Sequence, residues 1–247
     1  SGLRGRGGAG FPAAIKWQTV KDAQSNQKYI ICNADEGDSG NFADRAYMEG
    51  DPFGLIEAMA IAGFALGATV GYIYVRSEYP IAIKLLKAAI EIAKARGLLG
   101  GFDLQVFIGA GAYVCGEETA LLESIEGKRG MVRAKPPIPA LEGLFGKPSL
   151  VNNVLTFAAI APIILNGGAH YSGFGIGKSL GTIPIQLSGN IKNGGYYELP
   201  FGMTLRELIY DIGGGIKSGR EFGAAQIGGP LGAYFTAENL DLIFDYE

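Results

Sequence analysis

The sequence contains one histidine and two cysteines among 247 residues. His170 lies in a glycine-rich stretch, so we do not expect a Ser-His-Asp or Cys-His hydrolase. Cys32 and Cys115 stand far apart, which gives neither a disulfide framework nor the spacing of metal ligands. We therefore predict no metal site, and a reducing, cytoplasmic location is the default expectation.

Excess charge and membrane segments are also missing. The 21 basic and 24 acidic residues leave a net charge of −3, and residues 128–135 form the one short basic cluster. Nucleic acid is therefore not an expected partner. The longest uncharged run, residues 58–75, is interrupted by glycines, so we interpret it as a buried helix followed by a buried strand. No signal peptide is visible, and no direct membrane insertion is expected.

Glycine, in contrast, is abundant, with 40 residues dispersed among apolar segments. A first glycine loop spans residues 2–11 and includes Arg4 and Arg6. Such a loop lets backbone amides approach an anion while guanidinium groups hold phosphate. A second glycine loop, residues 109–119, precedes an expected helix whose first amides form an anion site. The two loops together suggest one large ligand that carries phosphate.

The first loop contains the spacing Gly5-x-Gly7-x-x-Gly10 of the dinucleotide fingerprint. That fingerprint should follow a strand and open a helix, whereas this one lies at the chain start with Pro12 close behind. An ordinary Rossmann placement is therefore not expected. Taken singly, each glycine could serve only as a turn, and Arg4 and Arg6 could lie in a solvated loop.

The first part of the chain alternates between strand and helix patterns. We predict strands at residues 28–32, 71–75 and 104–108, and helices at residues 52–66, 80–97 and 116–126. This order predicts an α/β domain with a Rossmann-like, mainly parallel sheet flanked by helices. Ligands of such sheets bind beyond the carboxyl ends of the strands.

The pattern changes after an apolar helix expected at residues 154–165. Strands at residues 183–191 and 196–199, an Asn-Gly turn at 192–195 and a helix at 204–211 predict a small α+β domain of β-grasp, ubiquitin-like type. Thr204 and Glu207 have the spacing of a capping box. We place the domains at residues 1–172 and 173–247.

Acidic residues near the expected ligand edge have more than one interpretation. Glu117 and Glu118 fall in the first turn of a helix, where carboxylates often only complement the helix dipole. Asp35, Glu36 and Asp38 could form a solvated loop. A metal site or a glycosidase pair has no supporting ligand pattern around them.

Several long motifs follow one another in the first part of the chain. They are Gly-Leu-Arg-Gly-Arg-Gly-Gly-Ala-Gly-Phe-Pro at 2–12, Asn-Ala-Asp-Glu-Gly at 33–37, and residues 109–121, 123–130, 143–148 and 151–154. With these motifs the chain resembles the flavin-bearing NADH dehydrogenase subunit of respiratory complex I, a subunit type that also occurs in NAD-dependent formate dehydrogenases and soluble hydrogenases. The resemblance covers most of residues 1–154, and the hairpin-helix segment resembles the family's soluble-ligand-binding domain.

The resemblance implies a bound FMN with NADH stacked over its ring. Hydride transfer by FMN needs no catalytic protein acid or nucleophile, which fits a chain with a single histidine. The implied FMN-binding residues are Gly5, Arg6, Gly7, Gly8, Lys16, Asn33, Asp35, Tyr113, Gly116, Glu117, Asn152 and Asn153. The implied NAD-binding residues are Gly10, Phe11, Glu36, Asp38, Glu118 and Lys135, with Phe11 on the adenine and Glu118 near the ribose hydroxyls.

The chain departs from the family's pattern at several positions. Asp38 replaces a glutamate, while Thr19 and Ile138 replace aromatic residues, so stacking on NAD is expected to weaken. The family's [4Fe-4S] cluster has no ligands here, since neither cysteine has the required spacing. We therefore expect a core fragment that exchanges electrons with a partner iron-sulfur protein.

Two questions of function remain open from the sequence. The motif spelling favours a formate dehydrogenase or hydrogenase type over complex I. The alternative to an oxidoreductase is a non-catalytic scaffold that retains the fold and holds neighbouring subunits. Joint retention of the implied FMN-binding residues favours the oxidoreductase, because a scaffold needs none of them.

Overall fold

The computed structural model describes residues 1–247, which divide into two compact units. The larger unit comprises Leu3–Gly37 and Asp44–Leu165, and the smaller comprises Ser1–Gly2, Asp38–Ala43 and Asn166–Glu247. The chain passes from the larger to the smaller unit between residues 165 and 166, and residues 1–2 and 38–43 also belong to the smaller unit. The domain boundary between residues 172 and 173 stays a prediction.

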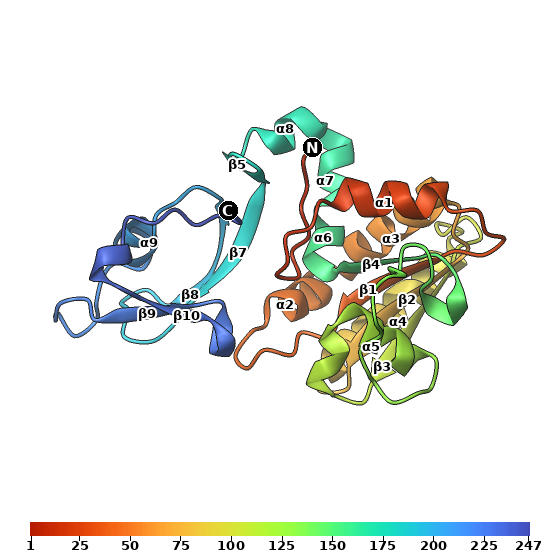
Figure 1. Ribbon diagram of the computed structural model, residues 1–247, viewed down its shortest axis with the longest axis horizontal. Coiled ribbons are helices and arrows are strands. Elements are labelled where there is room, and N and C mark those ends of the chain that lie inside the picture. Colours follow the sequence, from red (N-terminus) through yellow and green to blue (C-terminus); the bar gives the residue numbers. More distant parts are fainter. The chain divides into compact units, whose positions relative to one another are not determined.

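A four-stranded parallel sheet lies at the centre of the larger unit, in the order β3-β2-β1-β4 (Figure 1). One of its two inner strands, β1, begins with Tyr-Ile-Ile, residue types that favour a buried pleated surface. The three predicted strands all form, and a fourth, β4, joins them. The strands are β1 (Tyr29–Ala34), β2 (Val70–Arg76), β3 (Asp103–Gly109) and β4 (Ser149–Asn153).

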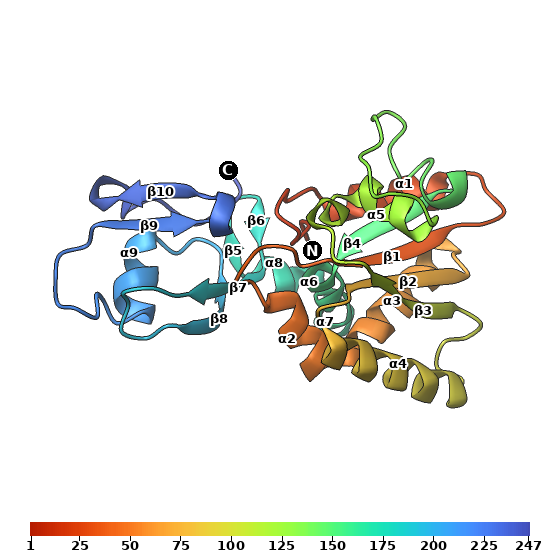
Figure 2. The same cartoon turned by 90° about the horizontal axis from the view of Figure 1, so that it is seen from below.

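Helices cover both faces of this sheet, as predicted. Figure 2 shows α3 and α4 on one side and α5 on the other. Ile31, Tyr74 and Val151 point to the α5 side, where they join Leu121 and Leu122 in one apolar core. The helices are α1 (Ala13–Asp22), α2 (Ala43–Gly50), α3 (Pro52–Leu66), α4 (Pro80–Ala95), α5 (Glu118–Ile125), α6 (Val154–Ala158) and α7 (Ile160–Asn166), with short 3-10 turns η1 (Tyr113–Gly116) and η2 (Leu144–Gly146).

Local sequence signals set the ends of α3. Pro52 occupies its first turn, and the Asp51 side chain accepts a hydrogen bond from the Gly54 amide at 2.9 Å. Gly67 ends it with a φ of 70°, a conformation that glycine adopts without steric cost. The uncharged run thus passes from α3 into β2, as predicted. No helix of the protein combines the length and hydropathy that spanning a bilayer requires.

Two predicted helices have different limits in the structure. The helix expected at residues 116–126 begins at Glu118, because residues 113–116 form the 3-10 turn η1. The helix expected at residues 154–165 is broken into α6 and α7. Pro162, in the first turn of α7, has no amide hydrogen to continue the α6 hydrogen-bond ladder.

The smaller unit is built from short antiparallel pairs. The hydrophobic core of this unit includes Leu205, Ile209 and Leu240. Its elements are α8 (Gly168–Ser172), β5 (Gly175–Ile176), β6 (Ser179–Leu180), β7 (Thr182–Leu187), β8 (Gly195–Pro200), α9 (Leu205–Glu207), η3 (Leu208–Ile212), β9 (Ala224–Ile227), η4 (Gly229–Leu231), β10 (Ala233–Thr236) and η5 (Ala237–Asn239). The strands and short helices agree with the predicted α+β organisation.

Within this unit the predicted capping box is confirmed, whereas the tight Asn-Gly turn is wrong. Thr204 and Glu207 cap each other's backbone at the start of α9. The β7–β8 pairing ends at Leu187 and Gly195, so residues 188–194 form a longer loop. The Lys192 and Asn193 amides donate to the carbonyls of residues 215 and 213 instead of closing a two-residue turn.

Candidate functional site

The candidate site lies at the carboxyl edge of the parallel sheet. The first glycine loop closes on itself, because the Gly5 amide donates to the Phe11 carbonyl at 2.8 Å. The Arg6 amide donates to Thr156 Oγ1 at 2.9 Å, which fixes the loop against α6, the helix that directly follows β4. The loop is therefore held beside the end of β4.

The second glycine loop follows β3 and reaches the end of β1. Asn33 Nδ2 donates to the Gly116 carbonyl at 2.8 Å. The Tyr113 ring packs over Gly37, where an added Cβ would lie 2.9 Å from a ring carbon. The loop is thus held against the segment that follows β1.

Asn33 and Asn153 bring the two loops together. They are register partners in the parallel pairing of β1 with β4, so their side chains point to the same face. Asn33 holds the second loop, and Asn153 packs beneath the first, since a Cβ at Gly7 would lie 3.3 Å from the Asn153 Cβ. The two glycine loops, about a hundred residues apart in the sequence, therefore contact neighbouring side chains at the same edge of the sheet.

A chain of ion pairs runs beside the loops. Lys16 Nζ lies 3.0 Å from Glu118 Oε2 and also donates to the Val151 carbonyl at 3.1 Å. Lys135 Nζ lies 2.9 Å from both Glu117 Oε1 and Glu118 Oε1. Glu118 thus bridges two lysines, one from α1 and one from the connector that follows α5.

The lysines keep both glutamates ionised. Burial raises the pKa of Glu118, but the ammonium groups of Lys16 and Lys135 outweigh it and hold the pKa below its ordinary value. The pKa of Glu117 is also lowered, since hydrogen bonds from Thr119 and Lys135 outweigh its burial. Glu117 also accepts from the amides of Thr119 and Ala120, at 2.8 and 3.0 Å, and caps α5. The dipole-complementing interpretation therefore holds for Glu117, together with its ion pair.

Asp35 is buried under the second loop. Its side chain is 5% exposed, and its Oδ2 lies 3.6 Å from the position of a Cβ on Gly116, with no hydrogen-bond partner. Burial raises the pKa of Asp35 to about 7, although the Arg76 guanidinium opposes the shift. Arg76 Nε is likewise without a partner. These orphaned polar atoms are the kind that a polar ligand satisfies.

Glu36 is occupied by the chain itself. Its carboxylate accepts from the amides of Asp44 and Arg45, at 2.9 and 3.1 Å, and from Tyr79 Oη at 3.0 Å. It therefore holds the first turn of α2. The predicted role of Glu36 in NAD binding stays a prediction.

The remaining predicted residues differ in their surroundings. Asn152 is buried. With its side-chain amide oriented so that both polar groups are satisfied, the oxygen accepts a hydrogen bond from Trp17 Nε1 at 3.1 Å. Phe11 and Tyr113 are exposed, at 49% and 59%. Asp38 belongs to the smaller unit, where its carboxylate lies beside Gly229, and its NAD-binding role stays a prediction.

The donor set fits a phosphorylated flavin. The amides of Gly7, Gly8 and Ala9 donate to no group of the chain. Gly8 has a φ of 107° with open space around it, so its backbone is accessible to a ligand. Arg6 lies in the same loop, and Lys16 of α1 bonds the Val151 carbonyl of β4, the strand beside whose end the loop is held, so the set suits an anionic phosphate. Orphaned Asp35 and the amide of Asn33 add polar contacts for a larger group.

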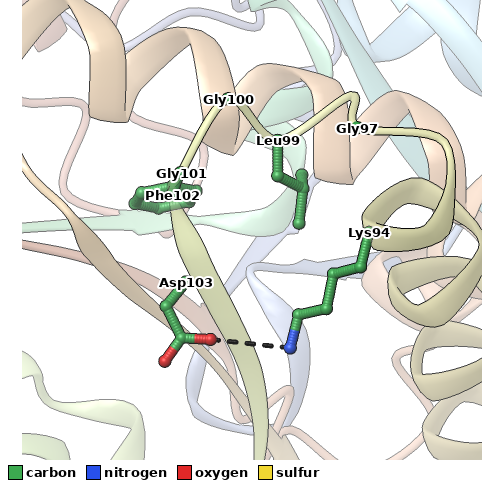
Figure 3. Close-up of a pocket in the computed structure, with 7 residues that line it drawn as sticks. All are labelled: Lys94, Gly97, Leu99, Gly100, Gly101, Phe102 and Asp103. Atoms are coloured by element: carbon green, nitrogen blue, oxygen red, sulfur yellow. Dashed lines mark ion pairs between the residues drawn. The ribbon is translucent and has the colours of Figure 1, made fainter.

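The structure also contains cavities away from this edge. The cavity in Figure 3 has a volume of about 280 Å³ and lies where α4 leads into β3, with Lys94, Leu99 and Phe102 in its wall. It lies at the amino end of β3, opposite the candidate site. A cavity of about 610 Å³ lies beside the connector, lined in part by Arg133 and Phe145. No predicted site residue lines either cavity.

Sequence reasoning missed several residues that support the site. Thr156 anchors the first loop, Asp44 bonds Asn153 at 2.7 Å, and Arg76 and Tyr79 contact Glu36. The sequence places residues 76–79 at the ligand edge, after a predicted strand, but it gives no sign of their contacts with Glu36. Nothing in the local pattern singled out Asp44 or Thr156.

The fold and site define an α/β protein with an anion-binding edge at the carboxyl ends of parallel strands. The family described as the Nuo51 FMN-binding domain matches residues 1–162, and the SLBB domain matches residues 184–232. The chain belongs to the Nuo51 FMN-binding domain family, which confirms the resemblance inferred from its motifs.

Known relatives agree with this assignment. HndC, from the NADP-reducing hydrogenase of Solidesulfovibrio fructosivorans, is 54% identical over the whole chain and 52% of the relative. A relative from the NADH-quinone oxidoreductase of Escherichia coli is 46% identical over the whole chain and 58% of the relative. A crystal structure of an NAD+-reducing [NiFe]-hydrogenase in the air-oxidized state aligns with a TM-score of 0.92 at 39% identity, covering 99% of this chain and 42% of that one. The chain thus spans about half the length of these relatives.

Proposed function

We propose that this chain is the FMN-bearing module of an oxidoreductase that exchanges a hydride with NAD(H). The observation that carries the proposal is the meeting of both glycine loops on Asn33 and Asn153. It gives one site with free backbone amides, two cations and buried polar atoms, which matches the chemistry of a phosphorylated flavin.

The chain's own residues have separate tasks in this proposal. The first loop, with Arg6 and Lys16, binds phosphate, while Asn33, Asp35 and Asn153 orient the polar parts of the flavin. The exposed Phe11 ring offers a stacking surface for adenine, and we assign Glu118 to the ribose hydroxyls on the family resemblance. FMN supplies the hydride chemistry when bound, so the protein contributes binding, alignment and exclusion of water.

We further propose partners and a setting for the module. Electrons pass to or from iron-sulfur centres of a multisubunit complex, as the resemblance to the NADH dehydrogenase subunit family implies. The 54% identity to HndC favours the hydrogenase type over complex I, although another hydrogenase protein, HoxS subunit alpha, is 43% identical and the NADH-quinone oxidoreductase protein of E. coli is 46% identical. Two free, buried cysteines fit a reducing, cytoplasmic location.

Flavin titration tests the proposal. The purified chain should quench FMN fluorescence with saturation, and NADH should bleach the bound flavin under anaerobic conditions. Asn33→Ala, which releases the second loop, should weaken FMN binding. Asn26→Ala is the control, because Asn26 bonds Lys147 on the surface, at the amino-terminal side of β1. A folded wild-type chain that leaves FMN fluorescence unchanged would support the scaffold alternative instead.

A further inference from the structure

Behind the first glycine loop lies a pair of buried carboxyl groups, one of which, Asp44, has no role in the proposed hydride exchange. Asp44 and Glu36 are 5% and 7% exposed, and the Asp44 amide donates to Glu36 Oε1. Two adjacent carboxyl groups in a buried setting resist double ionisation. One of them is therefore expected to hold a proton.

The hydrogen-bond donors around the pair converge on Glu36. Its carboxylate accepts from two backbone amides at the start of α2 and from Tyr79 Oη. Three donors thus meet on this one carboxyl group. Asp44 receives a side-chain hydrogen bond from Asn153.

The surroundings of Asp44 disfavour its ionised form. Burial raises the pKa of Asp44 well above its ordinary value, the Glu36 charge adds to the rise, and the Asn153 hydrogen bond offsets only part of it. Cys32 of β1 and Tyr79 are the other titratable groups that interact with Asp44. The adjacent cation, Arg45, pairs with Glu49 at 3.1 Å.

Asp44 reaches the glycine loop through one residue. Its Oδ2 accepts from Asn153 Nδ2 at 2.7 Å, while Asn153 Oδ1 accepts from the Leu155 amide at 2.9 Å and caps α6. Both ends of the Asn153 amide are thus fixed, and its Cβ supports Gly7. An ionised Asp44 at this position would repel a phosphate held by the loop.

We infer that Asp44 is a positioning residue of the flavin site, and that it fixes Asn153 beneath Gly7 in its protonated, uncharged form. The inference rests on the proposed function, because it assigns the loop above Asn153 to FMN. It explains how a carboxyl group can support an anion site without opposing the anion.

Two substitutions separate the position of Asp44 from its charge. Asp44→Asn has the shape of a protonated carboxyl and keeps an acceptor for Asn153, so the Kd values for FMN and for riboflavin should each stay within about twofold of wild type. Asp44→Ala removes the acceptor and should raise the Kd for FMN about tenfold. Asp103→Asn, at the opposite edge of the sheet, is the control and should change neither. Fluorescence quenching measures all the values, and thermal melting checks folding.

Infrared spectroscopy reads the proton directly. The difference spectrum of wild type minus Asp44→Asn should contain the C=O stretching band of a protonated carboxyl at neutral pH. Absence of that band, or tighter binding of FMN but not riboflavin by Asp44→Asn, would show that Asp44 is ionised and overturn the inference. Unchanged FMN binding by a folded Asp44→Ala would also overturn it. A wild-type chain that does not bind FMN refutes the proposed function instead, and the infrared band still decides the protonation of Asp44.

Discussion

The Lys16 ammonium and the Glu118 carboxylate lie 3.0 Å apart, although 102 positions separate them in the sequence. Lys16 comes from α1 and Glu118 from the first turn of α5. Lys135 extends the contact to the connector. The pair therefore joins a residue predicted to bind FMN to one predicted to bind NAD, and a substitution at Glu118 tests both roles.

Glu118→Gln should relax the discrimination against NADPH. The charge of Glu118 repels the additional phosphate of NADPH if it lies near the ribose hydroxyls, as the family resemblance implies. We expect the ratio of kcat/KM for NADPH to that for NADH to rise by about tenfold or more, equivalent to at least 1.4 kcal/mol. Steady-state assays with both nucleotides measure the ratio.

Glu123→Gln is the matched control for that variant. Glu123 lies on the same helix and pairs with Arg133 at 2.5 Å, away from the two lysines. The Glu123→Gln substitution likewise removes one carboxylate from α5. It should leave the ratio of kcat/KM for NADPH to that for NADH unchanged. An unchanged ratio in Glu118→Gln, or an equal rise in both variants, contradicts the placement of Glu118 at the ribose.

Local patterns predicted the elements more completely than the contacts of the site. Pro52 and Gly67 mark α3 in the sequence, and both have the predicted role in the structure. The strand β4 was missed because its five residues include three polar ones, whose burial depends on the neighbouring β1. Short polar strands carry no alternation that identifies them before the sheet is known.

Side-chain partners within the site could not be predicted from the sequence. Asn33 and Asn153 become neighbours only through the register of two parallel strands. Glu36 follows β1 like Asp35, yet it caps α2 while Asp35 lies under Gly116. Family resemblance named these residues, but only tertiary packing shows which atoms are already occupied.

Asp35 should make the stability of the protein fall as pH rises. Its pKa is about 7 in the folded state, against about 3.9 for an unperturbed aspartate. The folded state therefore binds more protons than the unfolded state between these values, and the free energy of unfolding decreases across that window. Asp35→Asn removes this contribution, so its melting temperature should exceed that of wild type at pH 8, by roughly 2–4 °C for each kcal/mol that the ionised Asp35 costs the folded state.

Melting curves of both proteins from pH 4 to pH 8 provide the measurement. At pH 4 the Asp35 carboxyl is neutral in the folded wild type, so the advantage of the asparagine variant should disappear. A difference that stays constant over the whole range would mean that Asp35 does not titrate there. Asp22→Asn, at the exposed end of α1, is the control for the aspartate-to-asparagine change itself.

Gly109→Ala should destabilise the larger unit. An added Cβ would lie 2.6 Å from the Tyr74 ring, which is buried and stacks on Phe107 with centroids 5.4 Å apart. Tyr74 Oη also lies 2.9 Å from Ser124 Oγ, so the ring cannot move without loss of a hydrogen bond. Overpacking of this kind costs about 1–3 kcal/mol.

Chemical unfolding measures the loss of stability in Gly109→Ala, and Gly50→Ala is the control variant. Gly50 is the last residue of α2, its φ is not positive, and an added Cβ meets no atom within 4 Å. Alanine should therefore be neutral or stabilise the protein by up to about 1 kcal/mol, because it restricts the unfolded chain. Equal losses in both variants would show that the Tyr74 contact does not limit residue 109.

Phe11→Ala should weaken NADH binding while FMN binding changes little. Phe11 is 49% exposed at the end of the first glycine loop, which leaves its ring available to adenine. Aromatic stacking on a base contributes about 1–3 kcal/mol, so KM for NADH should rise by roughly 5- to 150-fold. Phe64→Ala removes an aromatic ring that is 93% exposed on α3, and it should leave KM unchanged.

Because Phe11 also contributes its carbonyl to the closure of the loop, FMN fluorescence must be titrated in the same samples. A parallel loss of FMN affinity would assign Phe11 to loop structure, whereas a rise in KM alone assigns it to the nucleotide.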